Sequence, residues 1–387
     1  MTSLMNTYGQ RTLTLTRGAG TRVWDDAGNE YLDAISGIAV CGLGHAHPAV
    51  SKAISEQAAT LMHVSNLYNI PQQQALADTL VELSGMSQVF FSNSGAEANE
   101  AALKIARKYG NDKGIDRPIT LVMENSFHGR TLATLSATGN PKVQAGFAPL
   151  VDGFVHIPYN DVDAVRRALN EFSNVVAIFL EPVQGEGGIQ VPDSQYLNQL
   201  RDICDKHELL LMLDEIQTGI GRTGKFFAYQ HNGIIPDVLT TAKGLGNGMP
   251  IGACLVQGAA VNVLQAGNHG STFGGNPLSC SAAIAVLNEL QAGDYLQRAS
   301  NLGKQLVDGF SQRLKTCKKV RDIRGMGLLV GIELDRECSE IVALARSKGL
   351  LINVTAGNIV RLLPPLVLSD AEAEELIDII SVLIENL

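Results

Sequence analysis

The chain has 387 residues, of which 45% are hydrophobic and 18% are charged, and its net charge is −9. This length allows about two domains with a substantial core, and the composition is that of a globular α/β protein, not of a disordered or fibrous chain. The negative charge argues against general binding to nucleic acid or to an anionic membrane surface.

Sequence features also predict the compartment. No apolar run reaches the roughly 18 residues of a membrane-spanning helix, and the polar start MTSLMNTYGQRT lacks the apolar core of a secretory signal. The six cysteines include no CxxC pair, so we expect reduced thiols and no structural metal. We therefore expect a cytoplasmic protein.

Residues 1–45 are expected to form an extended N-terminal segment. Polar and apolar residues alternate over Thr12–Leu15, and residues 21–33, TRVWDDAGNEYLD, predict two short strands joined by a turn. The segment has too little apolar surface to fold alone, so it should pack on a partner subunit or on the C-terminal part of the chain. His45 and His47 have no acidic neighbour in the sequence, which favours a turn before a helix over a metal site.

Strand and helix patterns alternate between residues 46 and 290, which is typical of a large domain with a mostly parallel sheet between helices. Strands are predicted at Val89–Ser92, Ile119–Glu124, Val175–Glu181, Leu209–Leu213, Val238–Thr241 and Ala253–Gln257. Helices are predicted at Val50–Met62, Gln72–Leu83, Ala96–Tyr109, Val162–Phe172, Gln195–His207 and Leu278–Leu290.

Residues 291–387 are expected to form a separate small α+β domain. A helical pattern runs from Gly293 to about Lys315 and is followed by strand patterns near residues 320–334 and 350–363. A last helix is predicted from Asp370.

The stretch TTAKGLGNGMPIGA, residues 240–253, places Lys243 among small, uncharged and glycine-rich neighbours. A lysine amine attacks a carbonyl only when it is neutral, and burial or a nearby cation lowers its pKa. Taken alone, such a stretch is more often a mobile surface loop, so its context must decide.

That context is LLLMLDEIQTG, in which five apolar residues directly precede Asp214 and Glu215. The run predicts a strand buried on both faces, and ligands of parallel sheets bind at the carboxyl ends of such strands. A carboxylate there can hold a proton on a pyridine nitrogen. Together with a lysine that forms a covalent tether, it matches what a protein supplies to pyridoxal 5′-phosphate. A helix cap or a surface charge is the alternative interpretation of Asp214 alone.

Motifs along nearly the whole chain resemble those of the class III aminotransferases, in the family's order. They are RVWDDAGNEYLD, SGIAVCGLGHAHP, HVSNLY, FFSNSGAEANEAALK, SFHGRT, EPVQGEGG, LDEIQTGIGRTGKFFAYQ, AKGLGNGMPIGA, STFGGNP, RGMGLLVGIEL and RLLPPL. The resemblance implies the fold-type I architecture of pyridoxal-phosphate enzymes, with a large domain built on a mostly parallel seven-stranded sheet and a small C-terminal α+β domain. It also implies a homodimer with shared active sites, and transfer of an amino group from a terminal amine to 2-oxoglutarate.

The phosphate of the cofactor is expected at Ser94, Gly95 and Ala96. SNSGAE follows a predicted strand and opens a helix, whose free N–H groups and positive dipole end attract phosphate. An ordinary serine cap is the alternative on local grounds. By resemblance, Thr272 in STFGGNP reaches the phosphate of the neighbouring subunit.

Three further residues are assigned to the cofactor ring by resemblance. Phe127 in SFHGRT lies on one face of the ring and Ile216 on the other, while Gln217 bonds the phenolic oxygen. Taken alone, Phe127 would more often be a core residue.

Arg130, Glu186 and Arg361 are assigned to the substrates by resemblance. Arg130 holds the carboxylate distant from the reacting carbon, and Arg361 holds the carboxylate next to it. When a terminal amine occupies the site, Glu186 pairs with Arg361 and so avoids a buried uncompensated charge. Lys243 then moves the proton as general base and acid, with Asp214 as the partner of the ring nitrogen.

The amino donor expected within the family is N-acetylornithine, as in arginine biosynthesis. No tyrosine stands near Gly37 or Ile38 to contact a free α-amine, which suits an acylated donor. Succinylornithine, succinyl-diaminopimelate, ornithine and 4-aminobutyrate are the alternatives. Cys41, Gly42 and Asn247 depart from the family's usual residues and bear on this choice.

Two interpretations lie outside this chemistry. GIGRTGKF, residues 219–226, resembles a nucleotide-binding loop, but Phe226 replaces the Ser or Thr that would hold magnesium and no helical pattern follows. A regulatory protein that only binds the cofactor is disfavoured because the catalytic and substrate residues are all present.

Overall fold

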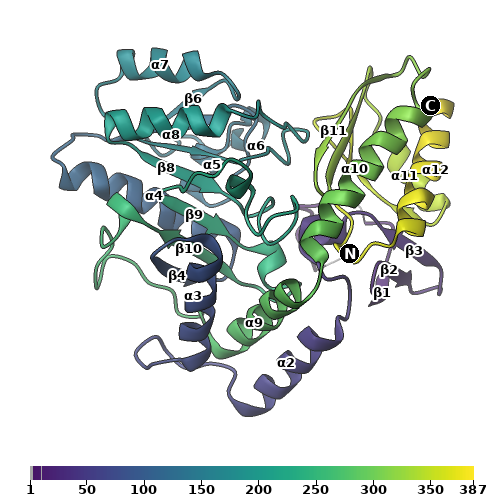
Figure 1. The fold of residues 1–387 in the computed structure, drawn as a ribbon, viewed down its shortest axis with the longest axis horizontal. Helices are drawn as coiled ribbons and strands as arrows, with labels where there is room; N and C mark the ends of the chain where they lie inside the picture. Colours follow the sequence, from purple (N-terminus) through teal and green to yellow (C-terminus); the bar gives the residue numbers. More distant parts are fainter. Residues whose placement is uncertain (1–2, 10) are drawn as a thin grey trace.

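A computed structural model describes residues 3–9 and 11–387, so residues 1, 2 and 10 of the predicted N-terminal segment lie outside it. Within this part of the chain the fold contains three β-sheets. Helices pack on the central seven-stranded sheet and on the C-terminal sheet (Figure 1). Every helix in the same part is too short or too polar to cross a membrane.

The central sheet has seven strands in the order β4-β10-β9-β8-β7-β5-β6. Strand β10 runs antiparallel to both of its neighbours, while the remaining pairs are parallel, so the predicted mostly parallel seven-stranded sheet is confirmed. The strands are β4 (Gln88–Ser92), β5 (Ile119–Met123), β6 (Phe154–Ile157), β7 (Val175–Leu180), β8 (Leu210–Asp214), β9 (Val238–Thr241) and β10 (Gly252–Val256).

Helices cover both faces of this sheet because the interior strands are buried on both sides. In β7, Ile178 and Leu180 pack into one core and Phe179 into the core on the opposite face. Helices α4 (Gly95–Asp112) and α5 (Leu132–Ala137) lie on the Phe179 side. The other core is covered by α2 (Pro48–Thr60), α3 (Pro71–Ser84), α7 (Val162–Glu171), α8 (Tyr196–His207) and α9 (Pro277–Ala292).

The sequence patterns located six of the seven central strands but missed β6. This edge strand, FVHI, is short and only partly buried, so its apolar signal is weak. The short helices α5 and α6 (Pro141–Gln144) were missed for the same reason of length, as were the 3₁₀ turns η1 (Ala228–His231), η2 (Lys243–Leu245) and η3 (Gly258–Ala260).

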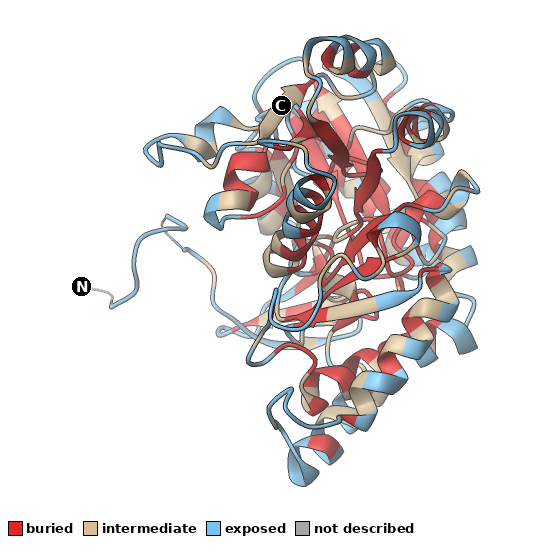
Figure 2. Ribbon diagram, turned by 90° about the vertical axis from the view of Figure 1, so that its left-hand side faces the viewer, coloured by how far each residue is buried: buried red, intermediate tan, exposed pale blue. Residues whose placement is uncertain are grey.

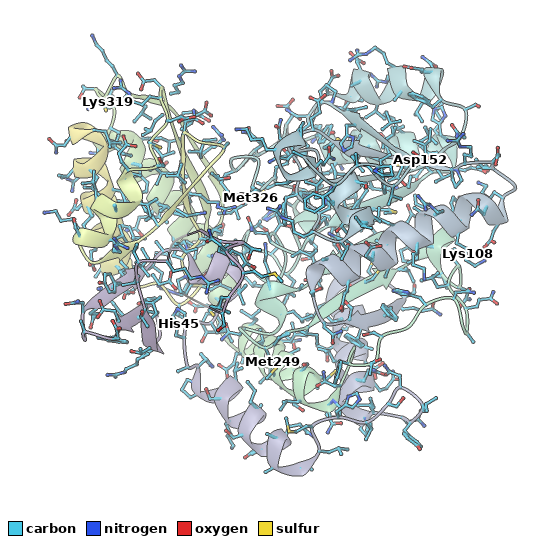
Figure 3. All side chains as sticks on the ribbon, turned by 180° about the vertical axis from the view of Figure 1, so that it is seen from behind. His45, Lys108, Asp152, Met249, Lys319 and Met326 are labelled. Atoms are coloured by element: carbon cyan, nitrogen blue, oxygen red, sulfur yellow. The ribbon has the colours of Figure 1, made fainter. Side chains whose placement is uncertain are left out.

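A second, antiparallel sheet follows in the C-terminal part, with strand order β11-β12-β15-β14. Helices pack on one of its faces, and Met326, at the end of β11, lies on the side toward the central sheet (Figure 3). The strands are β11 (Val320–Met326), β12 (Leu329–Leu334), β14 (Asn353–Thr355) and β15 (Ile359–Leu362), and the helices are α10 (Tyr295–Arg313), α11 (Ile341–Ser347) and α12 (Asp370–Asn386).

The N-terminal segment forms a third sheet from β1 (Leu15–Ala19), β2 (Arg22–Asp25) and β3 (Glu30–Asp33), with β13 (Leu350–Leu351) as its last strand. β1 begins at Leu15, the last residue of the alternating stretch Thr12–Leu15, and β2 and β3 are the two strands predicted in residues 21–33. Parallel pairing of β13 with β3 fastens the segment to the C-terminal part of the chain. Of the described residues before β1, Thr12 accepts a hydrogen bond from Arg346 of α11 over 2.6 Å, and those nearer the N-terminus lie at the edge of the molecule (Figure 2).

Candidate active site

The lysine and the acid predicted from the sequence line one cavity of about 630 Å³. We call it the lysine cavity. It lies where the carboxyl ends of β7 and β8 meet the start of α4 and the turn that follows β9. The predicted residues that line it are Ser94, Gly95, Ala96, Phe127, Arg130, Glu186, Asp214, Ile216, Gln217 and Lys243.

Lys243 begins the 3₁₀ turn η2, directly after β9. Burial and, to a smaller extent, the positive charge of Arg361 lower the pKa of its amine to about 8, against the opposing effect of Asp214, Glu181 and Glu186. Its backbone has φ of +43°, a conformation that is costly for a residue with a Cβ. The lowered pKa makes the neutral, nucleophilic amine far more abundant near neutral pH than in an ordinary lysine.

Asp214 ends β8 and is held by a buried hydrogen-bond network. Its Oδ2 accepts from Asn99 Nδ2 over 2.8 Å and from His128 Nδ1 over 2.7 Å. Asn99 in turn accepts a hydrogen bond from the Thr240 hydroxyl at 2.7 Å, and His128 stacks on Phe179 with ring centroids 4.2 Å apart. The network fixes the carboxylate at the wall of the cavity, and among the described residues Oδ1 accepts only from the Ile216 N–H, over 3.1 Å.

Sequence reasoning missed both Asn99 and His128. Asn99 lies one helical turn after Gly95 on the buried side of α4, and His128 follows the predicted Phe127 directly. The sequence shows only that Asn99 is a polar residue among apolar ones in α4. That it is fully buried, which would mark it as functional, cannot be read from one sequence.

The start of α4 offers free donors for an anion. Ser94 caps the helix by accepting from the Glu97 N–H over 3.2 Å, and Glu97 accepts from the Asn93 N–H over 2.6 Å. Within the described residues, the N–H groups of Gly95 and Ala96 make no hydrogen bond. A Cβ on Gly95 would lie 2.7 Å from Ile216 Cδ1, so only glycine allows this close approach of helix and cavity wall.

Gln217 carries a second unmet hydrogen-bond requirement. Its buried side-chain Oε1 has no partner among the described residues. Buried amide oxygens in proteins are nearly always bonded, so this group fits a polar ligand in the cavity. The phosphate-sized donor set at α4, the ring-holding carboxylate and the amide of Gln217 together fit pyridoxal 5′-phosphate.

Arg361 and Glu186 form the predicted ion pair. Arg361 Nη1 lies 3.0 Å from Glu186 Oε2, and Arg361 Nε donates to Asn353 Oδ1 over 3.2 Å. The arginine side chain is 1% exposed and the glutamate 49% exposed. Burial lowers the pKa of Arg361 and Glu186 opposes that effect. In the part of the chain that the structure describes, the buried Nη1 finds no hydrogen-bond acceptor of good geometry, so the guanidinium keeps a donor for a carboxylate.

Arg130 lies at the exposed side of the lysine cavity, with its guanidinium carbon 5.6 Å from the centre of the Phe127 ring. The Phe127 N–H donates to Glu181 Oε2 over 3.1 Å. Thr272, in contrast, lies in an exposed loop and does not line the lysine cavity of its own chain.

Glu181 is a further cavity residue that sequence reasoning did not single out. It follows β7 as Asp214 ends β8, and its Oε1 accepts from the Gly185 N–H over 3.2 Å. Burial, together with the charge of Asp214, raises the pKa of this carboxyl to about 7. It is thus partly protonated near neutral pH and adds little negative charge beside Lys243.

One wall of the cavity is the left-handed turn α1 (Ser36–Ala39), whose four residues have φ between +47° and +66°. For the β-branched Ile38 such a conformation costs roughly 1–2 kcal/mol. Asp33 holds the turn by accepting from the N–H groups of Ile35 and Ser36, each over 2.9 Å. His45 in turn bonds Asp33 at 2.7 Å, which raises the pKa of His45 to about 10.

The hydrogen bond to Asp33 therefore gives His45 a structural role in the turn. Among residues 3–9 and 11–387, no three His, Cys, Asp or Glu side chains converge in an arrangement suited to a metal ion.

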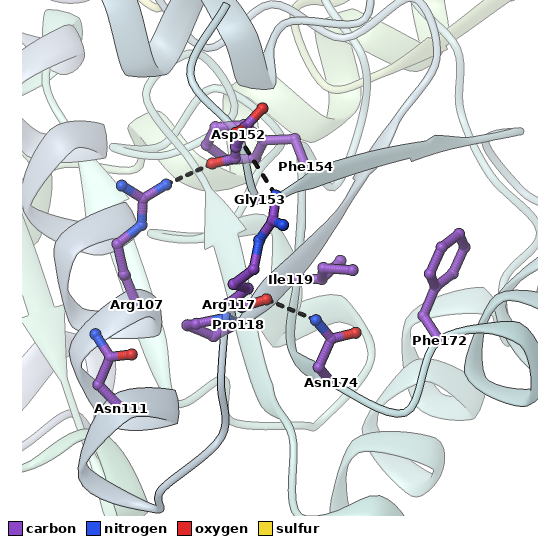
Figure 4. A pocket seen from close by; sticks show the side chains of 10 residues that line it. All are labelled: Arg107, Asn111, Arg117, Pro118, Ile119, Asp152, Gly153, Phe154, Phe172 and Asn174. Atoms are coloured by element: carbon purple, nitrogen blue, oxygen red, sulfur yellow. Dashed lines mark hydrogen bonds and ion pairs between the residues drawn. The ribbon is translucent and has the colours of Figure 1, made fainter.

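A second cavity, of about 540 Å³, lies at the opposite ends of β5, β6 and β7 (Figure 4). Arg107 donates to the Asp152 carbonyl over 2.6 Å, and Asn174 donates to the Arg117 carbonyl over 2.6 Å. None of the predicted site residues lines this cavity, so the chemistry is assigned to the lysine cavity alone.

Similarity to known proteins extends over nearly the whole chain. A family model described as aminotransferase class-III matches residues 4–384. An acetylornithine aminotransferase of Nitrosomonas europaea is 53% identical over 384 residues, which cover 99% of this chain and 98% of the relative.

Two solved structures share the fold. An acetylornithine aminotransferase from Elizabethkingia anophelis has 35% identity and a TM-score of 0.89, with 98% of this chain and 96% of that chain covered. An ornithine aminotransferase from Toxoplasma gondii, described with partial occupancy of pyridoxal phosphate at its active site, has 36% identity and a TM-score of 0.94, with 98% and 92% covered.

Proposed function

Since the chain belongs to the class-III aminotransferases and is a transaminase that depends on pyridoxal 5′-phosphate, we propose that its amino donor is N2-acetyl-L-ornithine. The terminal amino group passes to 2-oxoglutarate, which gives N-acetyl-L-glutamate 5-semialdehyde and L-glutamate, a step of arginine biosynthesis. The observation that carries the proposal is the similarity, along the whole chain, to acetylornithine aminotransferases.

The cavity residues divide the work of holding the cofactor. The Gly95 and Ala96 N–H groups and Ser94 would hold the phosphate, Phe127 and Ile216 the ring, and Gln217 the phenolic oxygen, with Thr272 contributed by the neighbouring subunit. Asp214, fixed by its hydrogen bonds to Asn99 and His128, would keep a proton on the ring nitrogen. When bound, the cofactor supplies a carbonyl group that takes up the amino group and a protonated ring that withdraws electrons.

Lys243 performs the proton transfer. Its neutral amine takes the proton from the donor's terminal carbon, and its ammonium form later returns a proton to the reacting centre. A pKa near 8 suits a group that acts as base and then as acid close to neutral pH.

Arg130, Glu186 and Arg361 select the two substrates. Arg130 holds the distant carboxylate of the donor and later of 2-oxoglutarate. While the donor is bound, Glu186 stays paired with Arg361. The carboxylate next to the carbonyl of 2-oxoglutarate then replaces Glu186, whose greater exposure lets it move into solvent.

The donor side of the cavity favours an acylated amine over free ornithine. Ile38 and Val40 line it with apolar side chains. The tyrosine that also lines the cavity, Tyr8, is 81% exposed and lies before β1, far in sequence from Ile38. Asn247, one of the departures from the family, bonds the main chain at Leu43 and Gly44 over 2.8 and 3.0 Å and so acts on the backbone beside this wall.

We propose that the enzyme works in the cytoplasm as a homodimer. The six cysteines are all free thiols, which suits a reducing compartment. Leu67, Tyr68 and Phe273 are strongly exposed on two adjacent loops, which Asn66 joins by hydrogen bonds to Ser271 and Gly274. Exposed apolar groups of this kind mark interaction surfaces, and Thr272 lies among them.

The test is a single half-reaction without any keto acid. Purified enzyme with bound cofactor is mixed with acetylornithine, succinyl-diaminopimelate, ornithine or 4-aminobutyrate, and the absorbance change of the cofactor is followed. We expect acetylornithine to react fastest, with ornithine and 4-aminobutyrate much slower. A faster reaction with any of the other three donors would overturn the proposed donor.

A further inference from the structure

Arg222 is a buried cation that has no carboxylate partner among residues 3–9 and 11–387. Its side chain belongs to a residue that is 3% exposed, and burial alone lowers its pKa to about 10. Within the described residues the guanidinium bonds only main-chain carbonyls, those of Leu328, over 3.1 Å, and Pro364. The Arg222 carbonyl also accepts from the Leu328 N–H over 2.9 Å.

Both hydrogen-bond acceptors, the carbonyls of Leu328 and Pro364, lie at the ends of strands of the C-terminal sheet. Leu328 lies in the turn between β11 and β12, and Pro364 lies just beyond β15, the strand that carries Arg361. The packing there leaves no room for adjustment, because a Cβ on Gly327 would lie 2.4 Å from the Arg222 carbonyl oxygen.

The segment after β15 is held on its other side by the wall of the lysine cavity. Leu363 donates to the Ala34 carbonyl over 2.7 Å and accepts from the Ser36 hydroxyl over 2.7 Å. Leu366 donates to the Gly42 carbonyl over 2.7 Å. Thus the short stretch that follows Arg361 is clamped between Arg222 and the left-handed turn α1.

Arg222 is joined to the cofactor side by the chain itself. The segment that starts at Asp214 carries Ile216 and Gln217 along the lysine cavity and then reaches Arg222. A displacement of Arg222 relative to β15 would therefore change the distance between the cofactor residues and Arg361.

An arginine at this buried position has to be explained, because burying its positive charge costs free energy of folding. Carbonyl hydrogen bonds offset only part of its desolvation, and an apolar side chain of similar volume would often be as stable or more stable. We infer that Arg222 is a positioning residue, which sets Arg361 at the distance from the lysine cavity at which it meets the carboxylate next to the carbonyl of the acceptor. The inference rests on the proposed function, which assigns that carboxylate to Arg361.

The experiment compares two acceptors that differ in their need for Arg361. Enzyme loaded with pyridoxamine 5′-phosphate is mixed with 2-oxoglutarate, which has a carboxylate next to its carbonyl, or with N-acetylglutamate 5-semialdehyde, which has none there. Single-turnover rates are measured for wild type, Arg222→Met, Arg222→Lys and Arg298→Met. Arg298 is the matched control, because it also donates to a main-chain carbonyl, that of Leu368 over 2.9 Å, but outside the clamped stretch.

We expect Arg222→Met to lower kcat/KM for 2-oxoglutarate about tenfold more than for the semialdehyde. Arg222→Lys should restore part of this selectivity, and Arg298→Met should not change it. Combining Arg222→Met with Arg361→Lys should lower the 2-oxoglutarate rate by less than the product of the single effects, because both act through one contact.

Equal loss with both acceptors, or no loss, would overturn the inference, since a purely structural arginine affects both reactions alike. Arg222→Lys keeps a cation in the same space and preserves the test if Arg222→Met does not fold. Failure of the proposed function is recognised separately, because then the wild-type enzyme itself does not react with the semialdehyde.

Discussion

Lys243 and the carboxylates around it show how one cavity tunes several charges. Burial favours the neutral forms of Lys243 and Glu181, lowering the pKa of the first and raising the pKa of the second. Asp214 accepts two hydrogen bonds from the buried side chains of Asn99 and His128. The same cavity thus holds an amine whose pKa is lowered beside a hydrogen-bonded carboxylate, which is the combination that the proposed proton transfer requires.

The lowered pKa of Lys243 makes a prediction about the stability of the cofactor-free protein. Below about pH 8 the lysine is charged in both the folded and the unfolded chain, and only the folded chain bears the cost of burying it. This cost corresponds to roughly 3 kcal/mol. We expect Lys243→Met to be more stable than wild type by up to that amount at pH 7.

The advantage should shrink as the pH rises from about 8 toward 10.5, because the folded wild type loses its buried charge there before the unfolded chain does. Urea unfolding of both cofactor-free proteins at pH 7 and at pH 9.5 measures it. A stability difference that does not change with pH would show that the lysine is not desolvated in the folded protein.

At the scale of elements, the anion-binding end of α4 depends on the strand beneath it. β10 runs antiparallel beside β4, and its first residue, Gly252, lies under Ser94. A Cβ there would approach the Ser94 carbonyl oxygen to 2.3 Å and Ser92 Oγ to 2.7 Å. The position of the phosphate-binding amides therefore depends on a strand that is distant in sequence.

Gly252→Ala should push the β4–α4 junction out of place. We expect a loss of about 1–3 kcal/mol in the free energy of unfolding, as for other overpacked sites, together with weaker capture of pyridoxal 5′-phosphate. Urea unfolding and titration of the cofactor-free protein with cofactor measure the two effects.

Gly42→Ala is the matched control, because its Cβ would make only an ordinary contact at 3.8 Å with Leu366 Cδ1. If Gly252→Ala bound the cofactor as tightly as Gly42→Ala, binding of the cofactor's phosphate would not depend on the position of the β4–α4 junction.

At the scale of the whole molecule, the lysine cavity lies where the three sheets approach one another. The central sheet supplies Asp214 and leads into Lys243, and the N-terminal segment supplies the wall at Ile38. Arg361 of the C-terminal sheet does not line the cavity itself but pairs with Glu186, which does. Thr272 does not line its own chain's cavity, and its loop is exposed. This arrangement supports a site completed by a second subunit.

Mixed dimers test the shared site. Lys243→Ala and Thr272→Asp are each expected to abolish most activity, the second because a carboxylate repels the phosphate. If the proposed sharing holds, a mixed dimer contains one site with Lys243 and Thr272 both intact. Random mixing by co-refolding should then restore about a quarter of the wild-type sites, since half of the dimers are mixed.

Mixing Lys243→Ala with Asp214→Ala is the control, because both residues line one chain's cavity and no intact site can form. Activity that stays absent in the first mixture while dimers form would rule out a contribution of Thr272 across the interface.

The sequence by itself determined those helices and strands whose formation depends on residues a few positions apart in the chain. The apolar run before Asp214 predicts a buried strand, and the serine after β4 predicts the start of α4, because strand burial and helix capping depend on neighbours a few residues away. The family resemblance predicted the fold class, which the structure confirms, and proposed the substrate residues.

Only the tertiary structure decided which segments distant in sequence contact and hydrogen-bond one another. The hydrogen bonds of Asn99 and His128 to Asp214, the reversed strand β10 and the carbonyl partners of Arg222 join parts of the chain that no local pattern relates. The left-handed turn at Ser36–Ala39 likewise contradicts local preference. Such features depend on packing and on buried hydrogen bonds, whose energies exceed local propensities and exist only once the chain has folded.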